Sequence, residues 1–277
     1  MSGTKDDSGG INVKVFEDVD HSEESRSYID ILDKFDALPG IQVLKQAAIE
    51  RCRIREGMAV LDCGCGAGLE TVRLARLVAP SGTVTGLDAS EAFLAEARRR
   101  ATGLRLPIEY RQGDAQRLPF ADRSFDIARA ERLFLYLQEP ATALAELARV
   151  TRDRGSVYVI EPDFETVTIN MGNRGLVRKV LNFDCDKDTR NGWIGRELPG
   201  MFGAAGLVDI EVQTGVVVFE PVAFSPYFFE IGALAHDGGF ITANELAEWQ
   251  GEIRDLLERD QLFCTITYFM ICGRVTG

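Results

Sequence analysis

A short apolar run, a glycine-rich turn and a helical pattern follow one another in this chain, and this order constrains its fold more than any other feature. The run covers Met58 to Cys63, the turn Gly64 to Gly68 with three glycines, and the helical pattern Leu69 to Val78. An apolar run of this length predicts a buried strand, and apolar residues three and four apart predict a helix that packs on it. We therefore expect a strand, a tight turn and a helix here.

The same unit recurs along the chain, which predicts the class of fold. Further strands are expected at 83–87, 108–112, 125–130 and 156–160, with helices at 90–100 and 140–150. The fifth strand is expected to end at Glu161 and Pro162. Later patterns predict helices at 175–183 and 195–206, a strand at 208–220, a helical stretch at 221–258 and a strand at 262–275. Such alternation predicts an α/β fold with a doubly wound parallel sheet, because right-handed crossovers place helices on both faces.

The domain organisation follows from the same patterns. Residues 1–21 carry few apolar side chains and are expected to form a mobile tail. Residues 22–56 contain two helical patterns broken at Pro39-Gly40, which we expect to act as a lid. Residues 57–277 would form the main domain, with cap insertions at about 162–195 and 221–258 that are rich in aromatic residues.

Charge and cysteine content exclude several classes of partner. Lys and Arg number 31 and Asp and Glu 43, so the net charge is 31 − 43 = −12. This charge repels nucleic acid and anionic membranes, and no window reaches the roughly 18 apolar residues of a membrane span. A polar N-terminus unlike a signal peptide predicts a cytoplasmic protein, whose six cysteines would be free thiols. Cys63 and Cys65 are spaced too closely for a C-x-x-C site, so no metal is expected.

Acidic residues after the first three strands predict a nucleoside site. In an open parallel sheet, ligands bind beyond the carboxyl ends of the strands, where the turn Gly64 to Gly68 lies. Asp88 follows the second strand, 88 − 62 = 26 residues after Asp62, and a carboxylate there can accept two hydrogen bonds from a ribose diol. Asp114 follows the third strand and would face the adenine end. The spacing of a triphosphate-binding loop is absent.

These stretches resemble the class I S-adenosylmethionine-dependent methyltransferases, in particular the small-molecule group that includes the ubiquinone and menaquinone biosynthesis enzymes. The matching segments are VLDCGCGAG, TGLDAS, GDAQRLPF with SFDIARAERL, EPATALAELARVTRDRG and VIEPDF, in the order of the family. The resemblance implies a Rossmann-like sheet of seven strands, the last of them antiparallel. It also implies S-adenosylmethionine as cofactor and S-adenosylhomocysteine as product.

The resemblance assigns cofactor contacts residue by residue. Gly64, Cys65, Gly66 and Gly68 would form the loop beneath the methionine part, and Asp62 would orient that loop and the amino group. Asp88 would hold the ribose and Ala89 would flank the adenine. In Gly113-Asp114-Ala115, the carboxylate and the Ala115 N–H would read the adenine edge, and Ala130 would lie near the amino-acid end. The alternatives are a turn cap for Asp62 and an Asx-turn for Asp114.

The chain departs from this group where many relatives carry a histidine after the fourth strand, because it has Leu135-Tyr136-Leu137 there. A base near neutral pH is most readily His. His236 and the tyrosines Tyr136 and Tyr28 are the candidates named here. Without that histidine we favour carbon methylation of a prenylated or aromatic acceptor, a small hydrophobic secondary metabolite, which needs no prior deprotonation.

The alternatives to carbon methylation are O- or N-methylation of a small metabolite and a non-catalytic cofactor-binding sensor. Glu131 and Arg132 either pair with each other, or Arg132 holds a carboxylate of the substrate or cofactor. A homo-oligomer is left open by the sequence.

Overall fold

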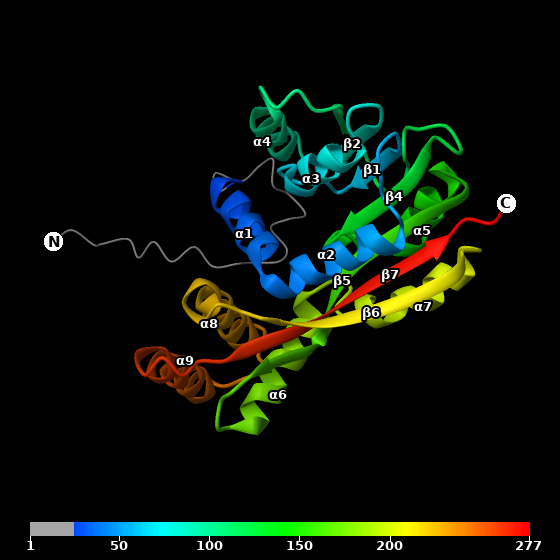
Figure 1. Ribbon diagram of the computed structural model, residues 1–277. Helices are drawn as coiled ribbons and strands as arrows, with labels where there is room; N and C mark the ends of the chain where they lie inside the picture. The colour runs from blue at the N-terminus through cyan, green and yellow to red at the C-terminus, as the bar shows by residue number, and fades with distance from the viewer. Residues whose placement is uncertain (1–24) are drawn as a thin grey trace.

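The central sheet has seven strands in the order β3-β2-β1-β4-β5-β7-β6 (Figure 1). The structure is a computed structural model that describes residues 25–277, so the predicted tail at 1–21 lies outside it. β7 pairs antiparallel with both β5 and β6, and the other pairs are parallel. The bounds are β1 Ala59–Cys63, β2 Thr83–Asp88, β3 Ile108–Gln112, β4 Phe125–Glu131, β5 Thr151–Ile169, β6 Val208–Val218 and β7 Cys264–Arg274. The predicted doubly wound sheet with an antiparallel last strand is confirmed.

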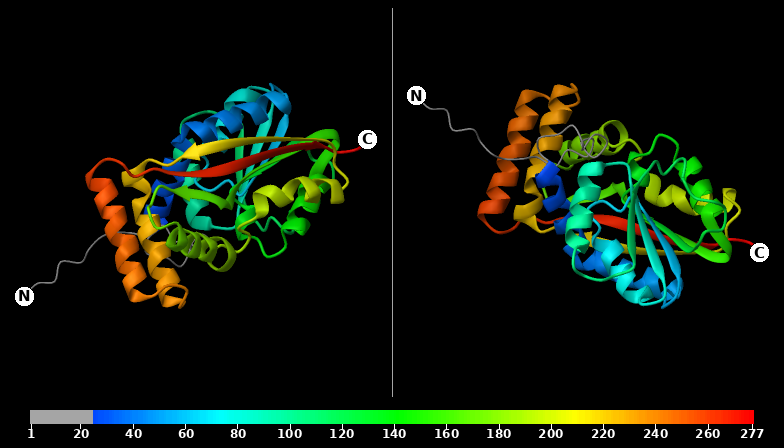
Figure 2. Two further views of the ribbon diagram at one scale, coloured as in Figure 1. Left: turned by 90° about the horizontal axis from the view of Figure 1, so that it is seen from below. Right: turned by 90° about the horizontal axis from the view of Figure 1, so that it is seen from above.

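Helices cover both faces of this sheet. Figure 2 shows α2 on one side of β6 and β7 and α7 on the other. The sheet-packing helices are α2 Pro39–Arg51, α3 Leu69–Val78, α4 Glu91–Ala101, α5 Pro140–Val150 and α7 Ile194–Ala204. Strand order reverses between β1 and β4, so their carboxyl ends open a crevice beside the glycine turn.

The second N-terminal helix is part of the core. Ile41, Leu44 and Ala48 on α2 are fully buried. A Cβ on Gly40 would lie 3.0 Å from the Val216 carbonyl oxygen, so the missing side chain lets the start of α2 approach β6. Because burying an Ile or Leu side chain is worth about 1.5–3 kcal/mol, we expect α2 to stay anchored on the sheet. The predicted lid movement is then expected of α1 (Ser25–Ala37).

β5 continues past the predicted end, so the expectation that Glu161 and Pro162 terminate it was wrong. β4 pairs with β5 only as far as Ile160, whereas β7 continues beside β5 and places Tyr268 opposite Pro162. Beyond Ile160 one edge of β5 has no neighbouring strand, and a proline is tolerated on such an edge because no ladder hydrogen bond is lost there.

A cap of helices gathers at the far end of β5 (Figure 1). It contains α6 (Arg174–Phe183), a π-helical turn at Asp184–Asp188, α8 (Pro221–Asp237) and α9 (Ala243–Glu258). The helical stretch predicted at 221–258 is thus two helices, because Thr242 and Glu245 form a capping box that starts α9. In residues 25–277 no helix is long and apolar enough to cross a membrane.

Candidate active site

A cavity of about 540 Å³ lies at the carboxyl ends of β1, β2 and β4 and extends under the cap. One end is lined by the glycine turn and the residues after β2 and β3, and the other by aromatic side chains. Of the predicted cofactor residues, those that line the cavity are Gly64, Cys65, Gly66, Asp88, Ala89, Gly113, Asp114 and Ala115. The structure therefore brings most of the sequence-predicted set together in one space.

The glycine turn owes its shape to residues that tolerate positive φ. Gly64, Gly66 and Gly68 have φ of +71°, +49° and +80°. The Gly64 and Cys65 N–H groups both donate to the Leu87 carbonyl, at 2.7 and 3.0 Å. A Cβ on Gly66 would meet only the Leu32 side chain, at 3.3 Å, so this part of the turn faces open space rather than packed backbone.

Asp88 fastens the turn to the end of β2. Its Oδ2 accepts a hydrogen bond from the Gly66 N–H at 2.8 Å, and its Oδ1 accepts one from the Ser90 N–H at 3.0 Å. Burial raises the pKa of Asp88, and the two backbone donors oppose that rise. Asp114 accepts the Gln116 N–H at 2.8 Å, so it forms the Asx-turn and also lines the cavity.

Asp62, Gly68 and Ala130 are not brought to the cavity surface. Asp62 is fully buried, and its two oxygens accept from Thr71 Oγ1 at 2.5 Å and from Arg129 Nη1 at 2.6 Å. Gly68 precedes α3 as its cap, and Ala130 is fully buried in β4. The predicted contact between Asp62 and the cofactor amino group stays a prediction, for a carboxylate that is buried and paired in this structure.

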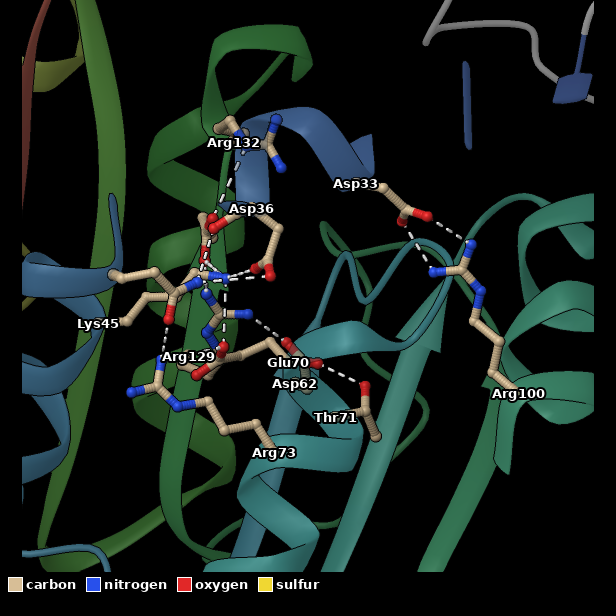
Figure 3. A network of polar contacts seen from close by, with 12 residues as sticks. Asp33, Asp36, Lys45, Asp62, Glu70, Thr71, Arg73, Arg100, Arg129 and Arg132 are labelled. Carbon is tan, nitrogen blue, oxygen red and sulfur yellow. Dashed lines mark hydrogen bonds and ion pairs between the residues drawn. The ribbon is translucent and has the colours of Figure 1, made fainter. Parts of the chain in front are cut away.

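Eight charged side chains, here called the charged cluster, form a network of ion pairs beside the cavity, and all of them except Asp62 and Arg73 line it. Figure 3 shows most of this network. Its members come from α1, α2, α3, β1 and β4 and the residue after β4, and they are Asp36, Lys45, Asp62, Glu70, Arg73, Arg129, Glu131 and Arg132. Four are acidic and four are basic. The cluster is thus neutral as a whole while it presents both signs of charge.

Lys45 is the centre of the charged cluster. Its Nζ lies 3.1 Å from Glu70 Oε2 and 3.1 Å from Glu131 Oε2, and it also pairs with Asp36. Burial acts to lower the pKa of Lys45, but Glu131 and Glu70 outweigh it and the pKa is raised. The ammonium therefore stays protonated although only 3% of the side chain is exposed.

Arg129 joins two carboxylates on neighbouring strands. Its guanidinium lies 2.6 Å from Asp62 Oδ1 and 2.5 Å from Glu131 Oε2. Burial would raise the pKa of Glu131, but Lys45 and Arg129 outweigh it and hold the pKa at about 2. Sequence reasoning missed Lys45, Glu70 and Arg129. The available signal was a lysine on the apolar face of a helix and an arginine inside the apolar strand FDIARAE.

Aromatic rings line the other end of the cavity. Phe35 of α1 packs edge-on against Phe219 and Phe224, with ring centroids 6.1 and 5.0 Å away. The remaining aromatic lining residues at this end are Phe164, Tyr227 and Tyr268. Rings of this kind give an apolar surface with a few polar atoms, as small-molecule sites do.

One of these aromatic residues is hydrogen-bonded to a buried carboxylate. Tyr227 donates its hydroxyl hydrogen to Oδ2 of Asp184, the first residue of the π-helical turn. Asp184 is fully buried, and burial raises its pKa to about 7. This pair has no counterpart in the sequence predictions, because nothing local to residue 184 indicates that residue 227 lies beside it.

The predicted catalytic residues are placed differently from one another. Tyr136 lies in a short 3₁₀ helix, Phe134–Tyr136, and lines the cavity. His236 lies in the last turn of α8, with its Nδ1 3.2 Å from Asp237 Oδ1, and is not among the lining residues. Tyr28 is in α1, but its side chain is outside the described part of the chain. Of the two whose side chains the structure describes, Tyr136 is brought to the cavity and His236 is not.

Cys63 and Cys65 are buried free thiols, as are the other four cysteines. Burial raises the pKa of the Cys65 thiol well above its ordinary value, which makes it a poor metal ligand or nucleophile. Within residues 25–277 no three His, Cys, Asp or Glu side chains gather as a metal site would require.

Comparison with known proteins identifies the family. Residues 61–159 match the model of a methyltransferase domain. Over 253 residues the chain is 32% identical to an uncharacterized 37.1 kDa protein in a transposon of Streptomyces fradiae, covering 90% of this chain and 71% of that protein. It is also 29% identical to the demethylmenaquinone methyltransferase of Geobacillus stearothermophilus, over 69% of this chain and 82% of the relative.

A solved structure agrees with this assignment at the level of the fold. It is a Haemonchus contortus phosphoethanolamine N-methyltransferase 2, in complex with phosphomonomethylethanolamine and S-adenosylhomocysteine. The likeness has a TM-score of 0.58 and 16% sequence identity, and covers 96% of this chain and 61% of that one. With the sheet order, the glycine turn and these relatives in place, the chain belongs to the class I S-adenosylmethionine-dependent methyltransferases.

Proposed function

We propose that this methyltransferase acts on a small, mostly hydrophobic molecule, and that it methylates a carbon of a prenylated or aromatic acceptor, such as a secondary metabolite. The observation that carries the proposal is the division of one cavity into a polar end and an aromatic end. The polar end has Asp88, Asp114 and the glycine turn, and the aromatic end has Phe219, Phe224 and their neighbours.

The polar end fits the cofactor on observations of this chain. The open space beside Gly66 leaves room for a ligand against the turn. Several polar atoms of the charged cluster are buried without a hydrogen-bond partner, which is costly unless a ligand pairs them. When bound, S-adenosylmethionine supplies an electrophilic methyl group on its sulfonium.

The residues of the chain then have two tasks. Asp88 and the glycine turn fix the nucleoside, and the aromatic rings exclude water and orient the acceptor carbon. Such alignment is worth up to about 7–11 kcal/mol of the barrier. No step in this scheme requires a side chain to take a proton before the methyl group is transferred. Among residues 25–277, the lining of the cavity contains no histidine, which fits this scheme.

The second candidate is O-methylation, and the Tyr227–Asp184 pair favours it. A buried carboxylate with a pKa of about 7 holds a proton near neutral pH and can exchange it. In this scheme an acceptor hydroxyl passes its proton toward the pair as the methyl group arrives. Tyr136 is the alternative base for the same reaction.

The test is turnover with a cofactor carrying a ¹³C-methyl group and a panel of aromatic and prenylated acceptors, including a demethylmenaquinol analogue. The methyl resonance of the product distinguishes a carbon acceptor from oxygen or nitrogen. Tyr136→Phe and Tyr227→Phe, compared by single-turnover rates, should keep most activity if carbon is methylated. A loss of about 10² to 10⁴ in the chemical step of one variant would assign O-methylation and name its base. If none of the acceptors leads to formation of demethylated cofactor, the result would favour a cofactor-binding sensor.

A further inference from the structure

Arg132 and Tyr268 line the cavity from opposite sides of β5, at the end that carries the aromatic rings. Arg132 follows β4, and its backbone N–H donates to the Ile160 carbonyl of β5 at 3.0 Å. Tyr268 lies on β7, opposite Pro162 of β5, which also lines the cavity. Because adjacent strands lie about 4.8 Å apart, two side chains of this length can contact one ligand that packs on Pro162.

Arg132 is the member of the charged cluster whose cation is least engaged by other residues. Lys45, Arg73 and Arg129 each donate side-chain hydrogen bonds to other side chains. The Arg132 Nε is buried without a hydrogen-bond partner and lies 3.7 Å from Glu131 Oε1. Figure 3 shows the end of the Arg132 side chain turned away from the rest of the cluster. A guanidinium in this position is suited to receive an anionic oxygen of a ligand.

The Tyr268 hydroxyl supplies a neutral hydrogen-bond donor beside that cation. Only 2% of the residue is exposed, and burial raises the pKa of Tyr268, while the positive charge of Arg132 acts against that rise. The hydroxyl therefore stays protonated at neutral pH and can donate to a ligand. The Phe35 ring packs over the Arg132 guanidinium, with its centroid 4.8 Å from the guanidinium carbon. Such apolar surroundings strengthen the attraction between a cation and an anion relative to water.

The carboxyl groups of the neighbouring elements are compensated and do not repel an anion at this place. Glu131 of β4 is held by Lys45 and Arg129, and Asp36 of α1 pairs with Lys45. Glu161 of β5 is fully buried, and burial raises its pKa to about 8, so it is largely uncharged at pH 7. The charge that a ligand meets between Arg132 and Tyr268 is therefore positive.

We propose that Arg132 and Tyr268 form an oxyanion subsite for the acceptor, which binds with an ionised oxygen conjugated to the carbon that is methylated, as in a phenolate or an enolate. This inference rests on the proposed function, because it narrows the class of acceptor that enters the aromatic end. A plain hydrocarbon would leave the guanidinium and the hydroxyl without partners, whereas an ionised oxygen pairs with both.

The subsite accounts for carbon methylation in a cavity whose lining, within residues 25–277, holds no histidine. The acceptor hydroxyl releases its proton to water on binding, because the guanidinium stabilises the ionised oxygen. The oxygen then donates electron density to the conjugated carbon, which attacks the methyl carbon. A C–C bond forms while the C–S bond breaks, and its electron pair goes to sulfur. The methylated carbon finally gives its proton to water and the oxygen takes one back, so the products are a C-methylated acceptor, the demethylated cofactor and one proton.

The experiment measures the ionisation of phenols bound to the full chain, with and without saturating S-adenosylhomocysteine. The probes are 7-hydroxycoumarin and 4-nitro-1-naphthol, whose absorption differs between phenol and phenolate, and their methyl ethers, which cannot ionise. The wild-type chain should bind each phenolate about 10- to 100-fold more tightly than the neutral phenol or the ether. Arg132→Gln should abolish this preference, and Tyr268→Phe should reduce it about three- to tenfold. Both variants should bind the ethers and S-adenosylhomocysteine within about threefold of wild type, which shows that they are folded.

Tyr158→Phe and Arg254→Gln are the matched controls and should keep the preference. Tyr158 is a buried tyrosine of β5, Arg254 packs over the Phe229 ring at 5.4 Å, and neither lines the cavity. The proposal is overturned if neither phenol binds, if phenolate and ether bind alike, or if Arg132→Gln keeps the preference. It is also overturned if S-adenosylhomocysteine removes the preference, which would assign Arg132 to the cofactor. Methylation of oxygen or nitrogen in the turnover assay would refute carbon methylation and leave the phenolate preference intact, so the two proposals fail separately.

Discussion

Replacing Lys45 by Met tests whether the charged cluster is held together in the folded state. The Met side chain keeps the apolar stem and removes the charge, so Asp36, Glu70 and Glu131 lose the cation that all three contact. Removing one partner of a buried ion pair costs about 3–5 kcal/mol, because an uncompensated charge remains. For a chain of this size, about 2–4 °C per kcal/mol gives a fall in Tm of about 6–20 °C.

The assay is urea and thermal unfolding without cofactor, followed by circular dichroism. Arg51→Met is the matched control, because the Arg51–Glu211 pair is solvent-exposed, with side chains 34% and 60% accessible, and should contribute under about 1 kcal/mol. The penalty of Lys45→Met should be smaller at pH 5 than at pH 8. Without the ammonium the pKa of Glu131 rises, so the folded state takes up a proton that the unfolded state has released, and stability falls as pH rises.

A free energy of unfolding of Lys45→Met within about 1 kcal/mol of the wild-type value at pH 8 would refute this reasoning. It would mean that water reaches these carboxylates in the folded protein. High salt distinguishes the two variants as well, since the surface pair of Arg51 is screened at 1 M salt, where the Debye length is about 3 Å, and the buried cluster is screened much less.

Four further results are expected. Asp88→Ala should weaken binding of S-adenosylmethionine and S-adenosylhomocysteine about five- to hundred-fold in calorimetry, because it removes the carboxylate that holds Gly66 and faces the cavity. Unchanged affinity would exclude Asp88 from the site. Gly66→Val should abolish binding and keep the circular dichroism spectrum, because its Cβ enters open space at φ +49°; normal affinity would show that the turn lies elsewhere. Hydrogen exchange of residues 25–37 should slow when S-adenosylhomocysteine binds, whereas equal protection in both states would mean that α1 is a rigid cap. Asp184→Asn should flatten the pH dependence of the free energy of unfolding between about pH 4 and 7. In this range the raised pKa of Asp184 makes the folded wild-type protein hold a proton and lose stability as pH rises. An unaltered slope would mean that Asp184 is ionised throughout.

The parts of the fold that sequence predicted are those in which local pattern decides structure. The glycine turn could be placed because its three glycines adopt positive φ, which few other residues do without strain. The end of β5 could not be predicted in this way. Pro162 would end the strand only if the N–H that proline lacks were needed for a hydrogen bond to a neighbouring strand. Whether it does depends on how far β4 extends beside β5, and that is a property of the assembled sheet.

The same distinction separates the site residues that were found from those that were missed. Asp88 and Asp114 follow their strands directly, and strand ends of a parallel sheet meet at one edge, so their position follows from topology. Arg129 lies 67 residues from Asp62, and only the pairing of β1 with β4 brings the two side chains together. The sequence therefore predicted a ligand contact for Asp62 but not the ion pair that the side chain makes with Arg129.

The position of α1 connects both ends of the cavity. Phe35 supports the Arg132 guanidinium on one side and packs on Phe219 and Phe224 on the other, and Asp36 of the same helix reaches Lys45. The outer contact of α1 is the forked pair of Asp33 with Arg100, at 2.8 and 2.9 Å, whose side chains are 41% and 18% exposed. A pair so exposed contributes about 0–1 kcal/mol, less than burying one phenylalanine. If α1 acts as the predicted lid, we therefore expect its closure to be governed by what its inner face meets. A nucleoside that fills the polar end and an apolar acceptor that packs on Phe35 would both favour the closed position, which excludes water from the methyl group only when both are present.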